Sequence, residues 1–379
     1  MSPVKQETMP SLSLVGSLTA RLWGLTLEDW QARAWKKLGA GEVSADGRML
    51  VGIDWVLSPA LAKCLLASPG AALVVRDDKS GQERIAAIHV PLGSDLAAAR
   101  ARINAIDPDW AALRSDGYRP GHMGDFVGDY DHALRKREAP YALSLLTTSS
   151  ADVEARLFKG SYKGVTDLVT KYVWPIPALH VTRLCANLKL TPNMVTTASL
   201  ALVVLAFYFF WNGQWLAGFA AGWGMTFLDT VDGKLARTTM TYSSWGNVYD
   251  HGIDLIHPPF WYWAIYQGLV SNGADDPWLL AALMIILSGY VAGRIIEGIF
   301  LRAFGFHIHV WRPVDAFMRE ITARRNPNLL IFMTATLVGF PIQGFILVAA
   351  WTVICTLFHL IALIQAYAHS EPVISWMDV

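Results

Sequence analysis

Four aspartates stand in two closely spaced pairs near the middle of the sequence, and their spacing suits metal chemistry. Asp229 and Asp232 are three residues apart, and Asp250 and Asp254 are four apart. In an α-helix these separations correspond to rotations of about 60° and about 40°, so each pair shares one helical face. Four carboxylates directed at one place repel one another, and such hard oxygen ligands suit Mg²⁺ or Mn²⁺. The sequence therefore predicts two divalent ions that together clamp a phosphate group.

Small and basic residues beside the aspartates fit phosphate binding. Gly233 and Gly246 lack side chains where a backbone or a ligand must come close, and Ala236 keeps one helix face shallow. Arg237 offers a planar guanidinium that can donate two parallel hydrogen bonds to a phosphate. His251 follows the first aspartate of the second pair, where contact with a substrate phosphate and ordinary packing are both open alternatives.

The spacing of these residues resembles the signature of a known enzyme family. Residues 229–254 read D-x2-D-G-x2-A-R-x8-G-x3-D-x3-D, which is similar at every fixed position to the CDP-alcohol phosphotransferases, also called CDP-alcohol phosphatidyltransferases. The segment Thr191-Pro192-Asn193-Met194-Val195-Thr196 also resembles the Pro-Asn-x-x-Thr sequence that this family places near the nucleotide. The resemblance implies that an alcohol hydroxyl attacks the β-phosphorus of a CDP-linked donor and that CMP leaves.

The resemblance also implies roles for individual residues. Asp250 and Asp254 would be catalytic, with Asp254 as the general base. The metal ligands would be Asp229, Asp232, Asp250 and Asp254, and the nucleotide would be bound by Asp232, Gly233, Ala236, Arg237, Gly246, Asn193 and Thr196. A metal-bound carboxylate is a weak base, so this assignment requires either a hydroxyl acidified by the metal or a loosely coordinated Asp254. Both alternatives stay open at this point.

Basic residues farther along the chain are candidates for binding the acceptor. Arg294 and Glu297 lie three apart in an apolar run, so they form either a structural ion pair or part of an acceptor pocket. Arg324 and Arg325 precede a helix start and suit anchoring at the membrane surface, with binding of a phosphorylated acceptor as the second interpretation. Together with His251, the three arginines Arg294, Arg324 and Arg325 are the acceptor-binding candidates.

Apolar segments long enough to cross a bilayer surround the motif. They predict an all-α integral membrane domain of six transmembrane helices over 195–370, preceded by a small cytoplasmic α/β domain. The fifth and sixth helices are separated at a turn near Gly339-Phe340-Pro341, because the apolar stretch there is too long for one helix. The six predicted spans are 195–212, 214–234, 247–270, 277–301, 328–345 and 347–368.

Charges at the span ends predict the orientation. The connections around residues 211–213, 271–276 and 339–344 contain no Lys or Arg. The opposite ends carry Arg183, Lys189, Lys234, Arg237, Arg302, Arg312, Arg319, Arg324 and Arg325. Positive charge favours the cytoplasmic side, so we expect a multi-pass protein of the cell (inner) membrane with both termini, including a tail over 371–379, in the cytoplasm. The opening MSPVKQETMP lacks the pattern of a secretory signal, which agrees with that orientation.

The first 150 residues alternate short apolar runs with helical stretches and predict a small parallel or mixed sheet. Strands are expected at 49–53, 72–75 and 85–90, with helices at 59–67 and 95–106, and an exposed loop over 116–131. Residues 151–194 follow as a juxtamembrane amphipathic helical segment, either on the membrane surface or packed on the first domain.

This first domain faintly resembles the nucleotidyltransferase domain fused to some family members, the inositol-phosphate cytidylyltransferase/phosphotransferase fusions. The likeness lies in the run from Val51 to Leu61, which reads as strand, aspartate and helix. The glycine-rich nucleotide loop of such domains is missing, and the segment from Gly39 to Gly47 does not replace it. We therefore expect a degenerate, non-catalytic relative that serves as scaffold, regulator or dimer contact.

Composition excludes several other classes of protein. Hydrophobic residues make up 53% and charged residues 16%, and the formal net charge is zero, so no nucleic-acid partner is expected. The cysteines Cys64, Cys185 and Cys355 form no metal or disulfide pattern. His307 and His309 are two apart but lack further ligands, and we expect ordinary loop histidines.

The leading hypothesis is an enzyme of phospholipid synthesis with CDP-diacylglycerol as donor and a polar alcohol, with or without a phosphate group, as acceptor. The reverse arrangement, a soluble CDP-alcohol with a lipid hydroxyl as acceptor, is the alternative. A divalent-cation transporter is a remote one, because the first aspartate pair closes its span and no internal repeat is visible. Membrane lipids and a second copy of the chain, in a homodimer, are the expected partners.

Overall fold

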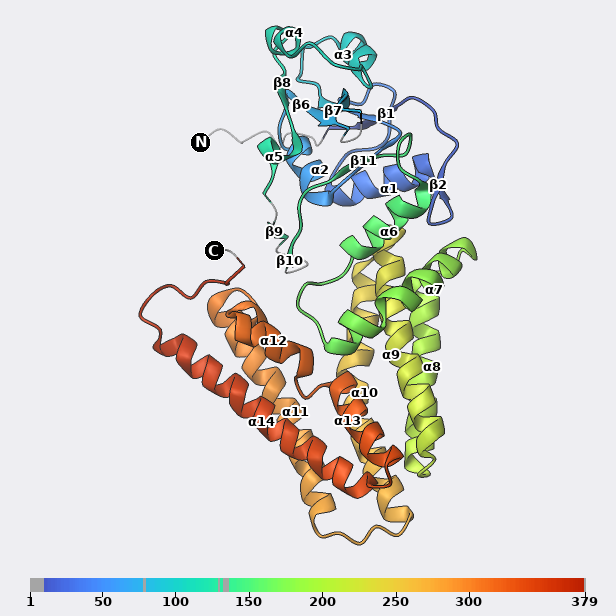
Figure 1. The fold of residues 1–379 in the computed structure, drawn as a ribbon, viewed down its shortest axis with the longest axis vertical. Helices are drawn as coiled ribbons and strands as arrows, with labels where there is room; N and C mark the ends of the chain where they lie inside the picture. Colours follow the sequence, from blue (N-terminus) through green and yellow to red (C-terminus); the bar gives the residue numbers. More distant parts are fainter. Residues whose placement is uncertain (1–9, 78–79, 129, 132–135, 378–379) are drawn as a thin grey trace.

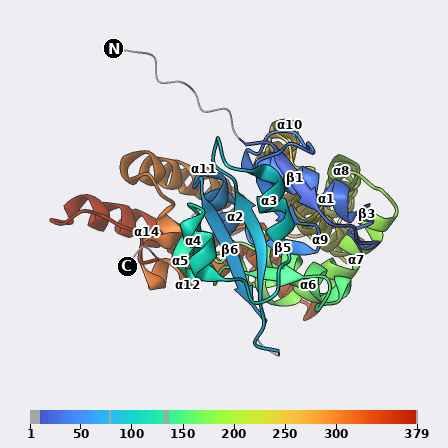
Figure 2. The same cartoon turned by 90° about the horizontal axis from the view of Figure 1, so that it is seen from above.

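The computed structural model has an α/β part stacked on a helical part (Figure 1). It describes residues 10–77, 80–128, 130–131 and 136–377. The α/β part comprises the described residues up to Ser144, and the helical part runs from Ser150 to Ala368. The opening MSPVKQETMP, which was predicted not to be a secretory signal, lies almost wholly outside the described residues. Viewed from above, α11 (Trp278–Phe304) and α14 (Pro341–Ala368) of the helical part extend beyond the α/β part on one side (Figure 2).

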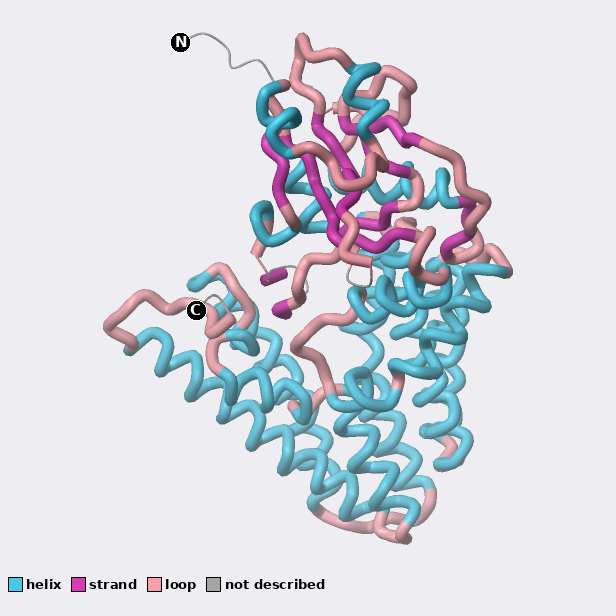
Figure 3. Tube along the Cα trace, turned by 45° about the horizontal axis from the view of Figure 1, so that its top comes forward, coloured by secondary structure: helices cyan, strands magenta, loops and turns pink. Residues whose placement is uncertain are grey.

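A five-stranded mixed sheet forms the centre of the α/β part, and all the strands among the described residues lie in this half of the molecule (Figure 3). Its order is β1-β4-β7-β6-β8, where β1/β4 and β6/β8 pair in parallel and β4/β7 and β6/β7 pair antiparallel. The strands are β1 (Leu12–Val15), β4 (Met49–Gly52), β6 (Ala71–Arg76), β7 (Glu83–His89) and β8 (Arg119–Gly121). The mixed sheet and its three predicted strands are confirmed.

Short two-stranded ladders and helices complete this part. The ladders pair β2 (Arg21–Leu22) with β3 (Leu25–Thr26), β5 (Trp55–Leu57) with β11 (Ala142–Ser144), and β9 (Tyr130–Asp131) with β10 (Lys136–Arg137). The helices are α1 (Leu27–Leu38), α2 (Pro59–Leu66), α3 (Leu96–Arg102), α4 (Trp110–Ser115) and α5 (Met123–Phe126). The predicted loop over 116–131 is wrong, because β8 adds to the sheet edge and α5 follows it. Its Gly- and Asp-rich composition hid a strand of only three residues.

Alternation along the strands gives the sheet two apolar faces. Met49 and Val51 of β4 pack in one cluster with Leu61 of α2, whereas Leu50 packs in another cluster with Ala99 of α3. Successive side chains of a strand point to opposite faces, so a run of consecutive apolar residues is covered on both sides. This arrangement explains why β4 reads as an unbroken apolar segment.

Three helices connect the α/β part to the rest of the helical part. They are α6 (Ser150–Gly160), the π-helix η1 (Val169–Val173) and α7 (Pro175–Asn187). Pro175 lies at the start of α7, where its missing N–H costs no hydrogen bond. The predicted juxtamembrane segment 151–194 is thus helical, but it is broken into three pieces.

Six helices occupy the places of the six predicted spans. They are α8 (Pro192–Trp211), α9 (Trp215–Thr238), α10 (Ser244–Ser271), α11 (Trp278–Phe304), α13 (Arg325–Leu337) and α14 (Pro341–Ala368). Among the described helices, α8, α11 and α14 are long and apolar enough to cross a membrane. The connections α8–α9, α10–α11 and α13–α14 all lie at the end of the molecule far from the α/β part (Figure 1).

The boundary between the last two helices differs from the prediction. The turn near Gly339 is correct, but α13 ends at Leu337 and α14 begins at Pro341, so the predicted ranges 328–345 and 347–368 are wrong. Gly339 has a φ of +91°, which ends the first helix, and Pro341 starts the second. Neither α12 (Pro313–Ile321) nor the short 3₁₀-helix η2 (Ile308–Val310) was predicted from the sequence.

One apolar cluster joins the two parts of the molecule. Leu27 and Trp30 of α1 pack in the same cluster as Phe158 of α6 and as Val231 and Leu235 of α9. Buried apolar area is the main favourable term in folding, so a shared cluster fixes the α/β part on the helix that carries the first aspartate pair.

Candidate functional site

The four aspartates line one cavity of about 480 Å³. Asp229 and Asp232 come from α9, and Asp250 and Asp254 come from α10. Each pair faces the cavity, as the helical spacing predicts. The cavity lies beside the turn between α9 and α10, at the ends of these helices nearest the α/β part.

The carboxylates form a donor set that fits a divalent cation. Oxygens of Asp229, Asp250 and Asp254 lie within 4.8 Å of one another. Asp232 is 3% exposed, and its Oδ2 accepts a hydrogen bond of 2.5 Å from Thr196. Its Oδ1 is buried and has no hydrogen-bond partner among the described residues. An unpartnered buried acceptor next to three further carboxylates is costly on its own and would be satisfied by a bound cation.

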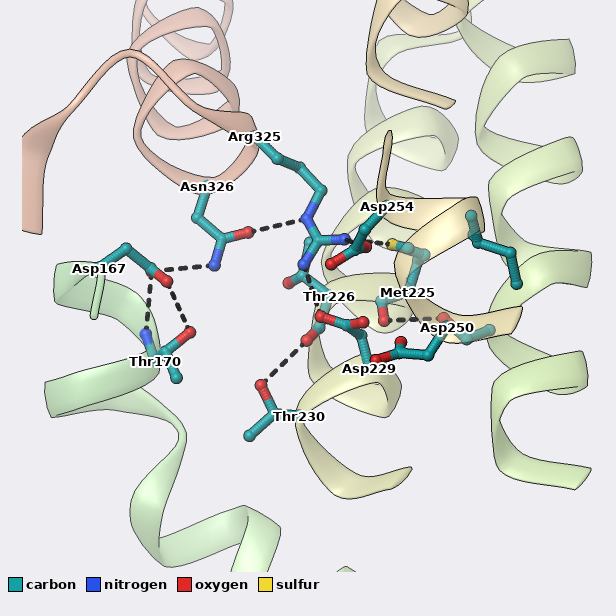
Figure 4. Close-up of polar contacts among 12 residues, drawn as sticks. Asp167, Thr170, Met225, Thr226, Asp229, Thr230, Asp250, Asp254, Arg325 and Asn326 are labelled. Carbon is teal, nitrogen blue, oxygen red and sulfur yellow. Dashed lines mark hydrogen bonds and ion pairs between the residues drawn. The ribbon is translucent and has the colours of Figure 1, made fainter. Parts of the chain in front are cut away.

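Arg325 of α13 already supplies one positive charge to this set (Figure 4). Its Nη2 lies 2.6 Å from Asp229 Oδ2 and its Nη1 lies 2.5 Å from Asp254 Oδ1. The guanidinium therefore bridges one aspartate of each pair and offsets part of their mutual repulsion. Asp254 keeps 41% of its side chain exposed despite this contact, more than Asp229.

The residues predicted to bind the nucleotide all line the same cavity. Asn193 and Thr196 of α8 form one side, and Gly233, Ala236 and Arg237 of α9, with Gly246 of α10, form the rest. A Cβ on Gly246 would lie 3.0 Å from Asn193 Oδ1, so glycine permits the close approach of α8 and α10. The Nε of Arg237 is buried without a hydrogen-bond partner among the described residues, which leaves it a donor for an anion.

The four acceptor candidates separate into two groups. His251 and Arg325 line the cavity of the aspartates. Arg294 and Arg324 instead line a smaller pocket with Glu297. Arg324 forms an ion pair with Glu297, and Arg294 Nη1 lies 3.6 Å from Glu297 Oε2. The structure therefore supports the ion-pair alternative for Arg294 and Glu297, and it does not bring Arg294 or Arg324 into the aspartate cavity.

His309 is no ordinary loop histidine. It is buried beside Glu297, with Nε2 3.3 Å from Glu297 Oε1, and it packs against His359. Burial lowers the pKa of the His309 imidazole well below its ordinary value, although the Glu297 carboxylate opposes the shift. A neutral histidine thus belongs to the ion-pair cluster of Glu297 and Arg324. The apolar sequence around it gave no signal for this contact.

Sequence reasoning also missed three residues that line the cavity, two of them in the linking segment, which comprises residues 150–187 between the α/β part and α8. Lys163 and Asp167 do so from the segment before η1, and Arg319 does so from α12. Asp167 accepts a hydrogen bond of 2.9 Å from Asn326, the neighbour of Arg325. Burial raises the pKa of Asp167, but the bond from Asn326, the charge of Arg319 and bonds from Thr170 together bring it below its ordinary value. A charged Asp167 thus ties the start of α13 to the linking segment.

Comparison with known proteins identifies the region that holds the site. Residues 189–317 match the sequence profile of the CDP-alcohol phosphatidyltransferase family. A stretch of 79 residues is 38% identical to archaetidylinositol phosphate synthase of Pyrococcus horikoshii, covering 21% of this chain and 42% of that protein. The alignment therefore spans less than half the length of this relative.

Solved structures of Mycobacterium tuberculosis phosphatidylinositol phosphate synthase are also similar. The form with CDP-DAG bound is 21% identical, with a TM-score of 0.40 over 49% of this chain and 92% of that one. The form in complex with manganese and citrate is also 21% identical, with a TM-score of 0.39 over 50% and 89% of the two chains.

Proposed function

We infer that residues 189–317, which match the CDP-alcohol phosphatidyltransferase family, form a domain of that family. From this premise we propose that the chain is a membrane enzyme that transfers a substituted phosphate from a CDP-linked donor to an alcohol. The proposal rests on one observation, that the predicted metal ligands and the predicted nucleotide-binding residues line the same cavity. The four aspartates and the six other nucleotide candidates all line it, although they come from three helices. Its volume of about 480 Å³ is ordinary for a small-molecule site.

In the proposed reaction, the acceptor oxygen forms a bond to the β-phosphorus and the bond from that phosphorus to the CMP oxygen breaks. The hydroxyl proton passes to Asp254, whose exposed part can reach a ligand in the cavity. Mg²⁺ or Mn²⁺ held by the four aspartates would supply positive charge to the phosphate oxygens. Arg237 would donate hydrogen bonds to the donor phosphate, since its Nε has no partner among the described residues. CMP is the leaving group.

An apolar groove beside the site favours CDP-diacylglycerol as the donor. The groove, of about 580 Å³, lies between α8 and α10 and is lined by Leu200, Val203, Val204 and Phe207 of α8 and by Val248, Gly252 and Ile256 of α10, among others. The same two helices also line the nucleotide site, through Asn193 and Thr196 of α8 and Gly246 of α10. Positions 193, 196, 200, 203 and 207 follow one stripe of α8. A single molecule could therefore place its nucleotide at the start of this stripe and its acyl chains along the rest.

Filling the groove tests this assignment. Gly252 faces open space, because a Cβ there would meet no heavy atom within 4 Å. The change Gly252→Leu should therefore leave the fold intact while occupying part of the groove. We expect the KM for CDP-diacylglycerol to rise by about tenfold, the effect of a misfit of one or two methylene groups in an apolar site. Steady-state CMP release in mixed micelles measures it.

A matched variant separates groove filling from a general effect of leucine in a membrane helix. Gly298 of α11 is also helical and also has open space at its Cβ, but it does not line the groove. Gly298→Leu should leave the KM unchanged. Equal KM values for Gly252→Leu and wild type would contradict the assignment of the groove to the donor.

We also propose that α8, α9, α10, α11, α13 and α14 are the six membrane helices, with the α/β part in the cytoplasm. The basic residues near the α/β part and the lack of Lys and Arg in the three far connections support this orientation. α13 has 13 residues and rises about 20 Å, so it would cross only part of the bilayer. Homodimer formation stays a prediction.

Release of CMP from defined donors tests the proposed function as a whole. With Mg²⁺ or Mn²⁺ present, CDP-diacylglycerol should give CMP once a suitable polar alcohol is added, and EDTA should stop the reaction. CMP release only from soluble CDP-alcohols would reverse the donor and acceptor. Absence of CMP release from every CDP-linked donor, with transport of the ion into proteoliposomes, would instead favour the transporter.

A further inference from the structure

The helix that carries the first aspartate pair has two functional faces. Asp229, Asp232 and Gly233 line the cavity, whereas Val231 and Leu235 belong to the apolar cluster shared with the α/β part. At about 100° per residue, Val231 lies about 160° from Asp229 and Gly233, whereas Leu235 lies about 60° from Asp232. The apolar cluster that includes α1 therefore lies behind and beside the face of α9 that lines the cavity.

Two side chains of α1 hold the turn at the end of α9. Trp30 Nε1 donates a hydrogen bond of 2.8 Å to the carbonyl oxygen of Thr238, and Lys37 Nζ donates one of 2.6 Å to the carbonyl oxygen of Tyr242. The Lys37 ammonium also lies 4.4 Å from the centre of the Tyr242 ring. Carbonyl groups in the last turn of a helix lack partners within the helix, so Trp30 satisfies an acceptor that otherwise needs water.

The held turn joins the two halves of the aspartate motif. It runs from Thr239 to Ser243 and contains Met240 at a φ of +57°, an uncommon conformation for a residue with a side chain. Thr241, Tyr242 and Ser243 line the cavity. Ser243 also caps α10 by accepting a hydrogen bond of 3.0 Å from the N–H of Gly246. A shift of the turn would therefore move the nucleotide side of the cavity.

We propose that α1 of the α/β part positions this turn and that Trp30 and Lys37 are thereby positioning residues for the CDP-linked donor. The inference rests on the proposed function for the identity of the donor, but the hold on the turn is a property of the fold. It gives the α/β part a task in the reaction although its sequence lacks a nucleotide loop. Neither side chain touches the reacting atoms, so the effect falls on donor binding more than on the chemical step.

Two tryptophans of the same helix provide a matched test. Trp30 and Trp35 are each 2% exposed, and the indole N–H of Trp35 donates to Gln31 Oε1 within α1 itself. The variants Trp30→Phe and Trp35→Phe thus remove equal volume and one buried hydrogen bond each, but only the first loses a bond to the turn. We expect Trp30→Phe to raise the donor KM about fivefold with kcat within about twofold of wild type, and Trp35→Phe to leave both within about twofold.

Hydrogen–deuterium exchange of the full-length protein in detergent supplies a readout that needs no substrate. In Trp30→Phe, amides of residues 239–246 should exchange about fivefold faster, and in Trp35→Phe they should exchange at the wild-type rate. Lys37→Met, compared with Lys36→Met, repeats the test with exposed side chains whose loss does not threaten folding. Equal exchange of the turn in the two tryptophan variants, or equal donor KM values, would overturn the inference. If the wild-type protein releases no CMP, the proposed function is wrong. The hydrogen–deuterium exchange rates of residues 239–246 would still show whether α1 holds the turn.

Discussion

Asp254→Asn is expected to lower kcat for CMP release by about 10²–10⁴ fold, the usual contribution of a general base. The amide has the same shape but cannot accept the proton of the acceptor hydroxyl. Asp254 is the better exposed of the two aspartates that Arg325 contacts, so it can reach a ligand in the cavity. The donor KM should change far less than kcat. Steady-state kinetics at saturating Mn²⁺ measure the two parameters separately.

A remote carboxylate serves as the control for this substitution. Asp276 accepts a hydrogen bond of 2.8 Å from the N–H of Trp278 at the start of α11, far from the cavity. Asparagine caps helices as well as aspartate does, so Asp276→Asn should have wild-type kinetics. Near wild-type turnover of Asp254→Asn would exclude it as the base, and a large rise in its Mn²⁺ requirement would assign it a ligand role instead.

Arg325→Gln is expected to lower the free energy of unfolding by about 3 kcal/mol in the absence of metal, because it leaves buried carboxylates without their cation. This value is the lower end of the range for broken buried ion pairs, since Asp254 is partly hydrated. Mn²⁺ should restore most of the loss. A ligand at about 100 times its Kd adds about 2.7 kcal/mol to stability, and the more negative site of the variant should bind the ion more tightly.

The neighbouring arginine gives a control for this prediction. Arg324→Gln also breaks an ion pair, but its partner Glu297 lies in a different pocket. It should destabilise the protein without being rescued by Mn²⁺. Thermal unfolding read by a thiol-reactive dye is suitable, since Cys185 and Cys355 are free and buried in the folded chain. Equal stabilisation of both variants by Mn²⁺ would contradict the expectation that the bound ion replaces the positive charge of Arg325 beside the aspartates.

Helical periodicity was enough to predict how the aspartates are grouped. Asp229 with Asp232, and Asp250 with Asp254, face one cavity because separations of three and four residues set direction on any α-helix. The nucleotide candidates were found by a motif whose gaps are equally local. The mixed sheet also followed from short apolar runs, because the strands of its centre are buried on both faces.

Contacts between distant segments could not be predicted in the same way. Arg325 reaches Asp254 across 71 residues, and its neighbour Arg324 turns to Glu297 instead. Adjacent residues at a helix start point in different directions. Which of the two arginines contacts the aspartates therefore depends on the position of α13, and the sequence does not give that position. Trp30 and Thr238 are 208 residues apart and carry no charge pattern that would have linked them. The Gly- and Asp-rich composition around β8 likewise hid that strand.

The apolar cluster shared by Trp30 and Leu235 has a consequence for biogenesis. The α/β part leaves the ribosome first, yet the apolar cluster around its α1 is completed only when Val231 and Leu235 of α9 have been made. Until then, the incomplete cluster leaves apolar surface uncovered, and such surface favours association with other chains. In the proposed topology, completion of the α/β fold is coupled to insertion of α9, and a failure of insertion would leave an aggregation-prone intermediate exposed to quality-control proteases.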